Sequence, residues 1–397
     1  MKKLLVFASL CVLSTFCVQF AAAQTTEAGA LPQPQAQPLT RGDTPQYQKF
    51  VDEMKAYKES LKQVHALIEK YQTASPEERD KITAEFTPLY EKLASQRKTL
   101  VPSALEAYKS VEGQNDEIRA FLCSMLEWST TNWENYEVAY EIAKVVFDYP
   151  LPSIDKSDVL YAYAAFAAFC TMNLDDAKKW RDVAIEKKAL AKVDPRDEMH
   201  ISSFLTRVLP QYEEAWNKEK AIREAEAKDN LPRVLIRTTK GDITVELFKN
   251  EAPTAVGNFL ELVSKGFYTD VPFHRVLPYF MAQGGDPTGT GAGGPGYCIP
   301  CECTKANARD HFRGSLSMAH AGRDTGGSQF FLTFVPTYFL NGQHTVFGRV
   351  VEGMDVLSDI QRIDPEKESE VAPDKIIEAK ILRGELYEFK KLPERRR

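Results

Sequence analysis

The chain has 397 residues, of which 27% are charged, and its formal net charge is −6. Single domains usually have ~100–200 residues, so this length allows more than one domain. Basic residues are interspersed with acidic ones, which argues against nucleic-acid binding, and no segment beyond the N-terminus is long and apolar enough to cross a membrane.

The N-terminus has the features of a secretory signal peptide. Lys2 and Lys3 precede an apolar run over residues 4–20, and three alanines follow. A basic start, a short apolar core and an A-x-A site predict that residues 1–23 are a signal peptide cleaved after Ala23. The apolar run is shorter than the ~20 residues that span a bilayer, so an uncleaved membrane anchor is the less favoured alternative.

The predicted mature protein is therefore exported, to the periplasm or outside the cell, with no stable membrane insertion. A short signal with two lysines favours a bacterial envelope over a eukaryotic secretory route. Residues 24–44 are rich in Gln, Pro, Thr and Ala and carry few large apolar side chains, so they are predicted to form a flexible leader.

A helical domain is predicted over residues 45–228. The apolar residues from Tyr47 to Tyr71 recur at intervals of three and four, which is the heptad pattern of a long helix. Residues 75–78 (SPEE) then supply the cap residue, proline and reciprocal glutamate that begin a second helix. We therefore expect an antiparallel helical hairpin, whose apolar seam closes either within the chain or between two chains.

Further helices are predicted after this hairpin: one begins at Asn115-Asp116, and others cover residues 137–147, 158–172, 174–190 and 198–228. The pair at 158–190 is weakly similar to a tetratricopeptide unit, although one copy is found where arrays need about three. No residue pattern in the helical domain indicates a catalytic role. Its expected role is to bind a protein partner or to hold clients, and the alternative is a structural spacer or a dimerisation hairpin.

Strand patterns begin at Leu231. β-Branched runs at residues 234–238 and 243–247 flank Lys240-Gly241, which is a hairpin signature. Residues 254–265 have the apolar spacing of an amphipathic helix, and many short strands with Gly-rich turns follow. This pattern predicts a closed or sandwiched antiparallel sheet.

Three ordered motifs lie in this region. They are residues 273–286 (FHRVLPYFMAQGGD), then 317–322 (SMAHAG) with 327–331 (GSQFF), and finally 339–348 (FLNGQHTVFG). In order and spacing they resemble the signatures of the cyclophilins, and the resemblance covers residues 231–386. It implies a peptidyl-prolyl cis-trans isomerase domain folded as a closed eight-stranded antiparallel β-barrel capped by two helices.

The chemistry that this resemblance implies needs few parts. A prolyl amide resists rotation by roughly 18–20 kcal/mol because its C–N bond is partly double, and the uncatalysed exchange takes ~10–100 s. Lowering that barrier requires no nucleophile, metal or cofactor, but a site that favours the twisted amide over either planar form. A fixed cation that donates hydrogen bonds to the amide, beside an apolar pocket for the proline ring, meets that need.

The resemblance gives Arg275 the catalytic role, since its guanidinium stays charged and offers several donors. It implies a proline pocket formed by Phe280, Met281, Phe331 and Leu340, with His344 at its edge. It implies that Gln283 and Gln329 hold the substrate backbone and orient Arg275. It implies that the backbone groups of Ala319, His320 and Ala321 pair with the part of the substrate peptide that precedes proline. The Gly-rich loop at 289–296 is expected to rim the cleft.

Two cleft positions depart from the commonest family form. Phe339 stands where many members have tryptophan, so the indole N–H is missing and we expect weaker binding of the inhibitor cyclosporin. His320 stands where asparagine is common. Its contact with substrate is expected to be largely main-chain, so we expect the change to be tolerated, with a mild pH response.

Three cysteines crowd one short stretch, at positions 298, 301 and 303. In an oxidising compartment they could form a disulfide or remain structural free thiols. As a metal site they would need about four ligands, and His311 is the nearby histidine in sequence. The sequence leaves these three alternatives open. Residues 387–397 end in three arginines and are expected to be a solvated basic tail rather than a docking patch.

The expected function is isomerisation of X–Pro bonds in exported proteins, in support of their folding, with proline-containing polypeptides as clients and no cofactor. One alternative is a binding protein or chaperone that grips Pro-containing segments with little turnover. Another is a helical scaffold that carries the barrel as a passenger. Arg275 favours the enzyme, because a pure binding protein has no need of that cation.

Overall fold

The structure is a computed structural model that describes residues 44–149, 158–367 and 371–394. The predicted signal peptide, the leader up to residue 43 and the three terminal arginines lie outside the described residues. The chain divides into two compact units: the described residues up to Trp128 with 141–149, and residues 129–140 with the described residues from Asp158 onward. No helix in the described ranges is long and apolar enough to cross a membrane.

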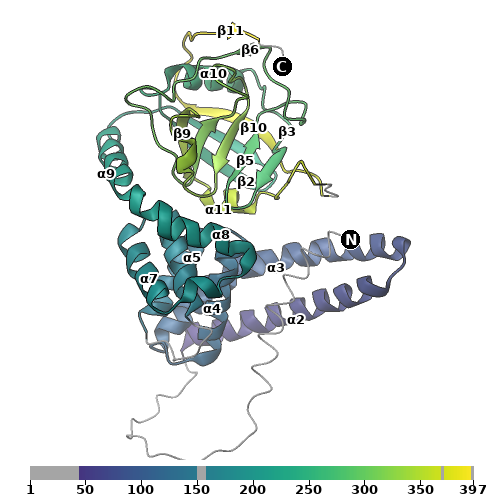
Figure 1. Cartoon of the computed structure of the whole chain (residues 1–397). Helices are drawn as coiled ribbons and strands as arrows, with labels where there is room; N and C mark the ends of the chain where they lie inside the picture. The colour runs from purple at the N-terminus through teal and green to yellow at the C-terminus, as the bar shows by residue number, and fades with distance from the viewer. Residues whose placement is uncertain (1–43, 150–157, 368–370, 395–397) are drawn as a thin grey trace, which may run out of the picture. The chain divides into compact units, whose positions relative to one another are not determined.

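The first unit is built on a helical hairpin. Helix α2 (Pro45–Thr73) runs antiparallel to α3 (Pro76–Ser110), as Figure 1 shows. The predicted capping box is present at the start of α3, where Ser75 Oγ accepts from the Glu78 backbone N–H and the Glu78 carboxylate accepts from the Ser75 N–H. Buried residues of the predicted seam include Phe50, Met54, Tyr57, Val64 and Ile68. The seam therefore closes within the chain, against α3.

Four more helices stand at predicted positions. They are α4 (Asp116–Thr131), α5 (Tyr136–Phe147), α6 (Val159–Cys170) and α7 (Leu174–Glu186). In the second unit α6 and α7 form the predicted helix–turn–helix. Helix α6 is apolar on all sides and almost entirely buried, as expected for a helix that lies inside a helical layer.

The single helix predicted over residues 198–228 is interrupted. The structure has α8 (Pro195–Ser203), a π-helical turn at Phe204–Val208 and α9 (Leu209–Glu226). Pro210 has no N–H to donate into the preceding turn, so the regular α-helical hydrogen bonding cannot continue there.

A nine-stranded antiparallel sheet forms most of the rest of the second unit, in the order β3-β10-β1-β2-β9-β7-β8-β5-β4. Its strands are β1 (Arg233–Thr238), β2 (Gly241–Leu247), β3 (Val271–Pro272), β4 (Arg275–Leu277), β5 (Met281–Gly284), β7 (Ser315–Met318), β8 (Phe330–Thr333), β9 (Val346–Glu352) and β10 (Lys375–Arg383). The first two form the predicted hairpin, with Thr238 opposite Gly241.

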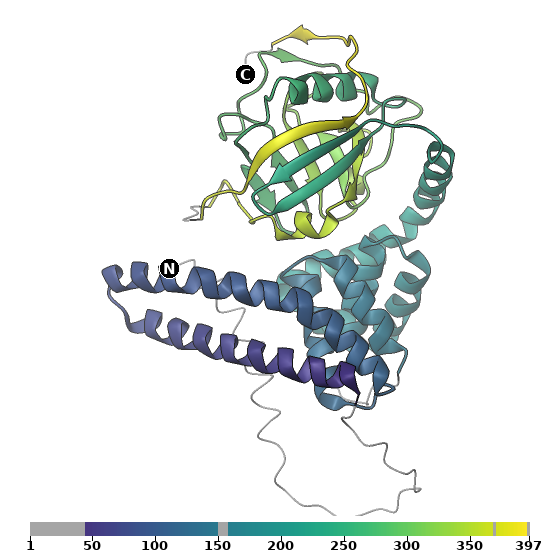
Figure 2. The same cartoon turned by 180° about the vertical axis from the view of Figure 1, so that it is seen from behind.

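Two helices cover the ends of the curled sheet. Helix α10 (Pro253–Ser264) lies over one end and the short α11 (Met354–Asp359) at the other, as Figures 1 and 2 show from opposite sides. The core under α10 is aromatic, with the Phe259 ring centred 5.3 Å from that of Tyr268 and 5.4 Å from that of Phe347. Burying such a ring contributes about 1.5–3 kcal/mol.

The sheet is not the closed eight-stranded barrel that the resemblance implies. It has nine strands and is open, with β3 at one edge and β4 at the other. The outer edge of β4 pairs with Ile363, which exchanges two backbone hydrogen bonds with Val276 at N···O distances of 2.7 and 2.8 Å. That pairing uses the backbone groups that β3 would need, and Pro272 in β3 has no N–H to offer.

The described part of the C-terminal tail, up to Glu394, contacts the sheet-bearing unit. Its strand β11 (Leu392–Pro393) pairs with β6 (Tyr297–Cys298). The Tyr387 hydroxyl donates to the Pro253 carbonyl oxygen at 2.8 Å, and Lys391 forms an ion pair with Glu261 at 2.9 Å. A hydrogen bond, an ion pair and a strand pairing therefore hold residues 387–394 to this unit, while the three arginines predicted to form a solvated end lie outside the described residues.

Candidate active site

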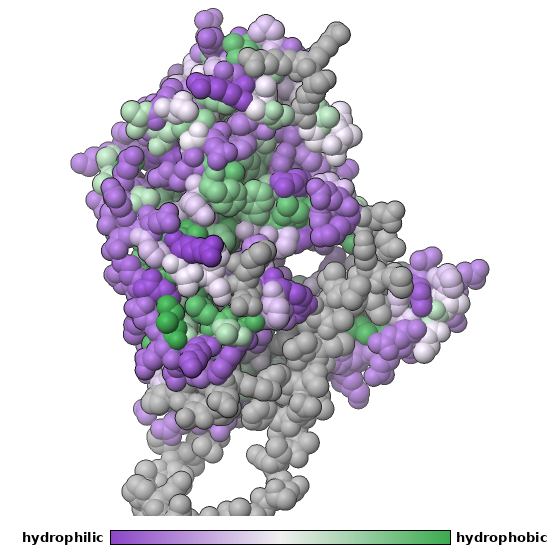
Figure 3. Space-filling view, viewed as in Figure 1, coloured by the Kyte–Doolittle hydropathy of each residue, from purple (hydrophilic) through white to green (hydrophobic). Residues whose placement is uncertain are grey.

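A cleft in the second unit gathers the residues predicted for the site, with the exception of Phe339. Those that line it are Arg275, Phe280, Met281, Gln283, Ala319, His320, Ala321, Gln329, Phe331, Leu340 and His344. Phe339 lies beside the cleft, 45% exposed, with its ring centred 5.6 Å from that of Phe280. On the face of this unit turned to the viewer in Figure 3, hydrophobic side chains gather in a hollow bordered by hydrophilic ones.

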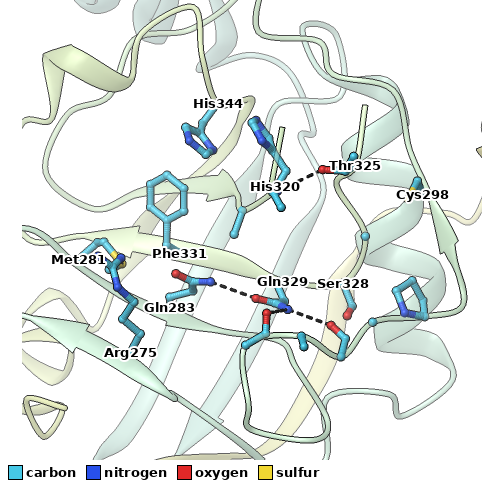
Figure 4. Close-up of a pocket in the computed structure, with 18 of the residues that line it drawn as sticks. Arg275, Met281, Gln283, Cys298, His320, Thr325, Ser328, Gln329, Phe331 and His344 are labelled. Atoms are coloured by element: carbon cyan, nitrogen blue, oxygen red, sulfur yellow. Dashed lines mark hydrogen bonds between the residues drawn. The ribbon is translucent and has the colours of Figure 1, made fainter. Parts of the chain in front are cut away.

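The apolar part of the cleft is built by β5 and β8. These strands pair with Gln283 opposite Phe331, and alternate residues of a strand share one face of the sheet. Met281 and Gln283 on β5 therefore face the same side as Phe331 on β8 (Figure 4). The buried cluster consists of Met281, Ala319 and Phe331, with Leu277, Phe280 and Leu340 packed against it.

Arg275 stands beside this cluster. It lies on β4, opposite Gln283 of β5, and is half-buried. Its guanidinium carbon is 5.5 Å from the centre of the Phe280 ring, and its Nη1 is 3.9 Å from the Met281 sulfur (Figure 4). A ring face and a polarizable sulfur thus hold the cation at the border of the apolar pocket.

Gln283 and Gln329 are bonded to each other. Gln283 Nε2 donates to Gln329 Oε1 at 3.0 Å, and Gln329 Nε2 donates to the carbonyl oxygens of Gly291 and Gly293 at 2.9 and 2.8 Å (Figure 4). The pair ties β5 to the Gly-rich loop that was predicted to rim the cleft. These hydrogen bonds link the two glutamines to each other and to the loop. Arg275, which the glutamines were expected to orient, is instead contacted by Phe280 and Met281.

Asp286 fixes the Gly-rich loop from within. Its carboxylate accepts hydrogen bonds from the backbone N–H groups of Thr288, Gly291 and Gly293 at 2.7, 2.6 and 3.0 Å. Burial by itself raises the pKa of this carboxyl, but the hydrogen bonds from Thr288 and the loop outweigh it and the pKa is lowered. The folded loop therefore stabilises the charged form of the Asp286 carboxylate.

Two histidines stack at the edge of the pocket, with His320 and His344 ring centroids 4.1 Å apart. His344 Nδ1 lies 2.9 Å from the Met318 carbonyl oxygen, and since that oxygen can only accept, Nδ1 carries the hydrogen. Burial lowers the pKa of His344, which favours its neutral form. A hydrogen bond with Cys301 raises the pKa of His320, whose Nε2 also lies 2.9 Å from the Gln343 carbonyl oxygen.

The three clustered cysteines are free thiols in this structure. Cys298 lines the cleft from β6. Nowhere in the described ranges do three or more His, Cys, Asp or Glu side chains form a group that could hold a metal ion. His311, considered as a further ligand, has its ring nitrogens 2.9 Å from Asn341 Oδ1 and 2.9 Å from Ser317 Oγ.

Several residues at the other end of the cleft were missed by the sequence analysis. They are Tyr297, Cys298, Thr325, Ser328 and Glu394. Thr325 and Ser328 lie in or beside the second motif, so their place could have been inferred from it. Glu394 had no such signal, because it reaches the cleft only through the pairing of β11 with β6.

Comparison with known proteins identifies the family of this chain. Residues 233–381 match the family model of the cyclophilin type peptidyl-prolyl cis-trans isomerases/CLD. A peptidyl-prolyl cis-trans isomerase of Helicobacter pylori is 56% identical over 131 residues, which are 32% of this chain and 80% of the relative. Peptidyl-prolyl cis-trans isomerase B of Bacillus subtilis is 52% identical over 129 residues, 32% of this chain and 90% of the relative. The crystal structure of a Cryptosporidium parvum cyclophilin type peptidyl-prolyl cis-trans isomerase, 34% identical, covers 39% of this chain and 99% of its own with a TM-score of 0.35.

Proposed function

Because this chain belongs to the cyclophilin-type peptidyl-prolyl cis-trans isomerases and has their activity, we propose that it isomerises X–Pro bonds of exported proteins and so assists their folding. The proposed site rests on one observation. The guanidinium of Arg275 lies at the border of the apolar cluster around Met281 and Phe331. A donor cation beside a pocket for a proline ring is the arrangement that the reaction needs.

Arg275 is the proposed catalytic residue. As the amide twists, its conjugation is lost and the prolyl nitrogen regains a lone pair that can accept a hydrogen bond. A guanidinium donor at that nitrogen or at the carbonyl stabilises the twisted amide more than either planar form. A hydrogen bond to a charged group contributes about 1.5–3 kcal/mol, which corresponds to a rate factor of roughly 10 to 100.

The remaining side chains hold the substrate in this proposal. The proline ring lies in the pocket of Phe280, Met281, Phe331 and Leu340, with His344 and Phe339 at its edge. Gln283 and Gln329 hold the substrate backbone beside the Gly-rich loop. The N–H groups of Ala319 and Ala321 already donate to the Gln329 carbonyl oxygen and to Thr325 Oγ1, so the carbonyl groups of residues 319–321 carry the pairing with the peptide before proline.

The export and partner proposals rest on the sequence. The basic and apolar residues at 1–23 support removal of a signal peptide and a location in the periplasm or outside the cell, with a bacterial envelope favoured. The helical domain is proposed to bind clients or a protein partner. The support for this is that the sequence of the α-helical hairpin, with helices of 29 and 35 residues, carries no motif that indicates catalysis.

The test is prolyl isomerisation of an X-Pro tetrapeptide by the full chain beside its Arg275→Ala and Arg275→Lys variants. We expect kcat/KM to fall roughly 10- to 100-fold in Arg275→Ala. Arg275→Lys should recover only part of the loss, since lysine lacks the rigid fork of donors. Weak catalysis in all three proteins, with Pro-peptide binding retained, would instead support a recognition module.

A further inference from the structure

The turn between β4 and β5 carries a residue in an unusual backbone conformation. Tyr279 has a φ of 54°, in the left-handed region that residues other than glycine enter rarely. It directly precedes Phe280, whose ring contacts Arg275 and forms one wall of the proposed proline pocket. Such a conformation persists only where the surrounding structure fixes it, so the groups that hold Tyr279 also fix the place of Phe280.

Those groups come from the helical part of the same unit. The Tyr279 backbone N–H donates to Glu134 Oε2 at 2.7 Å, and its hydroxyl donates to Asp197 Oδ1 at 2.6 Å. Its ring stacks on that of His200 with centroids 4.9 Å apart, and Tyr279 is only 7% exposed. Glu134, just before α5, and two residues of α8 therefore hold a turn of the cyclophilin domain.

The second oxygen of the Glu134 carboxylate reaches the other side of β4. Glu134 Oε1 accepts from Arg362 Nε at 3.1 Å, and Arg362 Nη1 donates to the Ile360 carbonyl oxygen at 2.6 Å. The next residue, Ile363, exchanges two backbone hydrogen bonds with Val276, the neighbour of Arg275. One buried carboxylate thus holds the segments on both sides of the strand that bears Arg275.

Glu134 suits this role because both of its oxygens are used and its environment excludes water. It is 2% exposed, and its own carbonyl oxygen accepts from Ser358 Oγ at 3.0 Å. A glutamine in its place offers one acceptor oxygen and one donor group, so it cannot satisfy the Tyr279 N–H and the Arg362 guanidinium together. Leaving either buried donor without a partner is energetically costly, so we expect the segment that carries it to move.

We propose that Glu134 is a positioning residue for the isomerase site: it holds the β4–β5 turn and the 360–363 segment so that Arg275 and Phe280 keep their places relative to each other. The helical segment around Glu134 is then part of the enzyme rather than a separate module. This inference rests on the proposed roles of Arg275 and of the pocket.

The test compares Glu134→Gln with the control Glu219→Gln in the full chain. Glu219 is also a buried carboxylate from the helical part, and its ion-pair partners Arg309, Arg223 and Arg349 lie outside the β4–β5 turn. Melting temperature, kcat and peptide Kd are measured for each, with an Ala-Pro tetrapeptide followed by NMR exchange well below both melting temperatures. Both variants are expected to melt at a lower temperature than the parent.

Glu134→Gln is expected to lose ~10-fold or more in kcat, with peptide Kd changed much less, because misplacement of Arg275 affects the twisted amide more than the planar one. Glu219→Gln is expected to keep the kcat of the parent. Equal losses in the two variants, or an unchanged kcat in Glu134→Gln, overturn the proposal.

Two further variants keep the test decisive. If Glu134→Gln does not fold, Arg362→Gln removes the Glu134–Arg362 ion pair from its half-buried partner. The same loss in kcat is expected there, and an unchanged kcat overturns the proposal. Arg275→Ala separates the two proposals. A large loss there with none in Glu134→Gln or Arg362→Gln refutes the positioning role alone, whereas no loss in Arg275→Ala refutes the proposed site.

Discussion

Cys301 and Asp324 exchange hydrogen bonds across two loops beside the cleft. The Cys301 N–H donates to Asp324 Oδ1 at 2.8 Å, and the Asp324 N–H donates to Cys301 Sγ at 3.2 Å. Burial by itself raises the pKa of the Cys301 thiol, but hydrogen bonds from His320 and from the Asp324 backbone outweigh it and the pKa is lowered. Burial raises the pKa of Cys303, so Cys301 and Cys303 are expected to differ in reactivity although they are two positions apart.

Cys301 is predicted to react first with iodoacetamide near pH ~7.5, because the thiolate is the nucleophile and its neighbours favour it. Burial raises the pKa of Cys303 and of Cys170, so both should react more slowly. Peptide mass spectrometry over a time course measures the three rates. His320→Asn should slow Cys301 and leave Cys303 unchanged, and equal rates for Cys301 and Cys303 in the parent would refute the prediction.

His320 predicts a pH-dependent substrate preference. Its pKa is raised above the ordinary value of about 6.5, so it gains a positive charge beside the cleft as the pH falls. The ratio of kcat/KM for Glu-Pro peptides to that for Lys-Pro peptides should rise between about pH 8 and about pH 6. In His320→Asn the ratio should stay constant, and a parallel rise in that variant would assign the effect to another group.

The same titration has a stability consequence with a fixed sign. A raised histidine pKa in the folded state stabilises the fold below the unfolded value of about 6.5, and this contribution is lost as the pH rises through the folded pKa. The melting temperature of the parent minus that of His320→Asn should therefore be larger at about pH 5 than at about pH 9. The opposite order would contradict the raised pKa.

Phe339→Trp is predicted to tighten cyclosporin binding. Phe339 is 45% exposed at the side of the cleft, so the larger indole has room and its N–H can reach a bound ligand. One neutral hydrogen bond contributes about 0.5–1.5 kcal/mol, which is roughly a two- to tenfold gain in affinity. Calorimetric titration measures this gain, kcat/KM for a short peptide should change less, and unchanged affinity would refute the prediction.

Asp286→Ala is predicted to loosen the Gly-rich loop. Its carboxylate accepts from three backbone N–H groups, and a single hydrogen bond to a charged group contributes about 1.5–3 kcal/mol, so the free energy of unfolding should fall by at least ~1.5 kcal/mol. Urea denaturation measures the loss.

The loss in Asp286→Ala should also depend on pH. The pKa of this carboxyl is lowered in the folded state, so its contribution is present above the unfolded value of about 3.9 and is lost as the pH falls through the folded pKa. The difference between parent and variant should therefore shrink below about pH 3. A difference that stays constant down to that pH would refute the role of the charge.

The sequence by itself determined the local elements and part of the cleft lining. The heptad pattern gave the buried side of α2, and the SPEE segment gave the capping box of α3, because both depend on residues within a few positions of each other. The three motifs identified the residues at the apolar end of the cleft, since each motif covers a short strand or loop there, but they did not identify Tyr297 or Glu394.

Only the tertiary structure decided whether the sheet closes into a barrel and which distant residues hold the strands of the site in place. The Val276–Ile363 pairing leaves the sheet open, and the hydrogen bond from Tyr279 to Glu134 joins residues 145 positions apart. No periodicity records such contacts, because one buried carboxylate finds its two partners only when three distant segments fold together. The physical reason is that a buried charge must be paired, while the identity of its partner is set by proximity in space rather than by order in the chain.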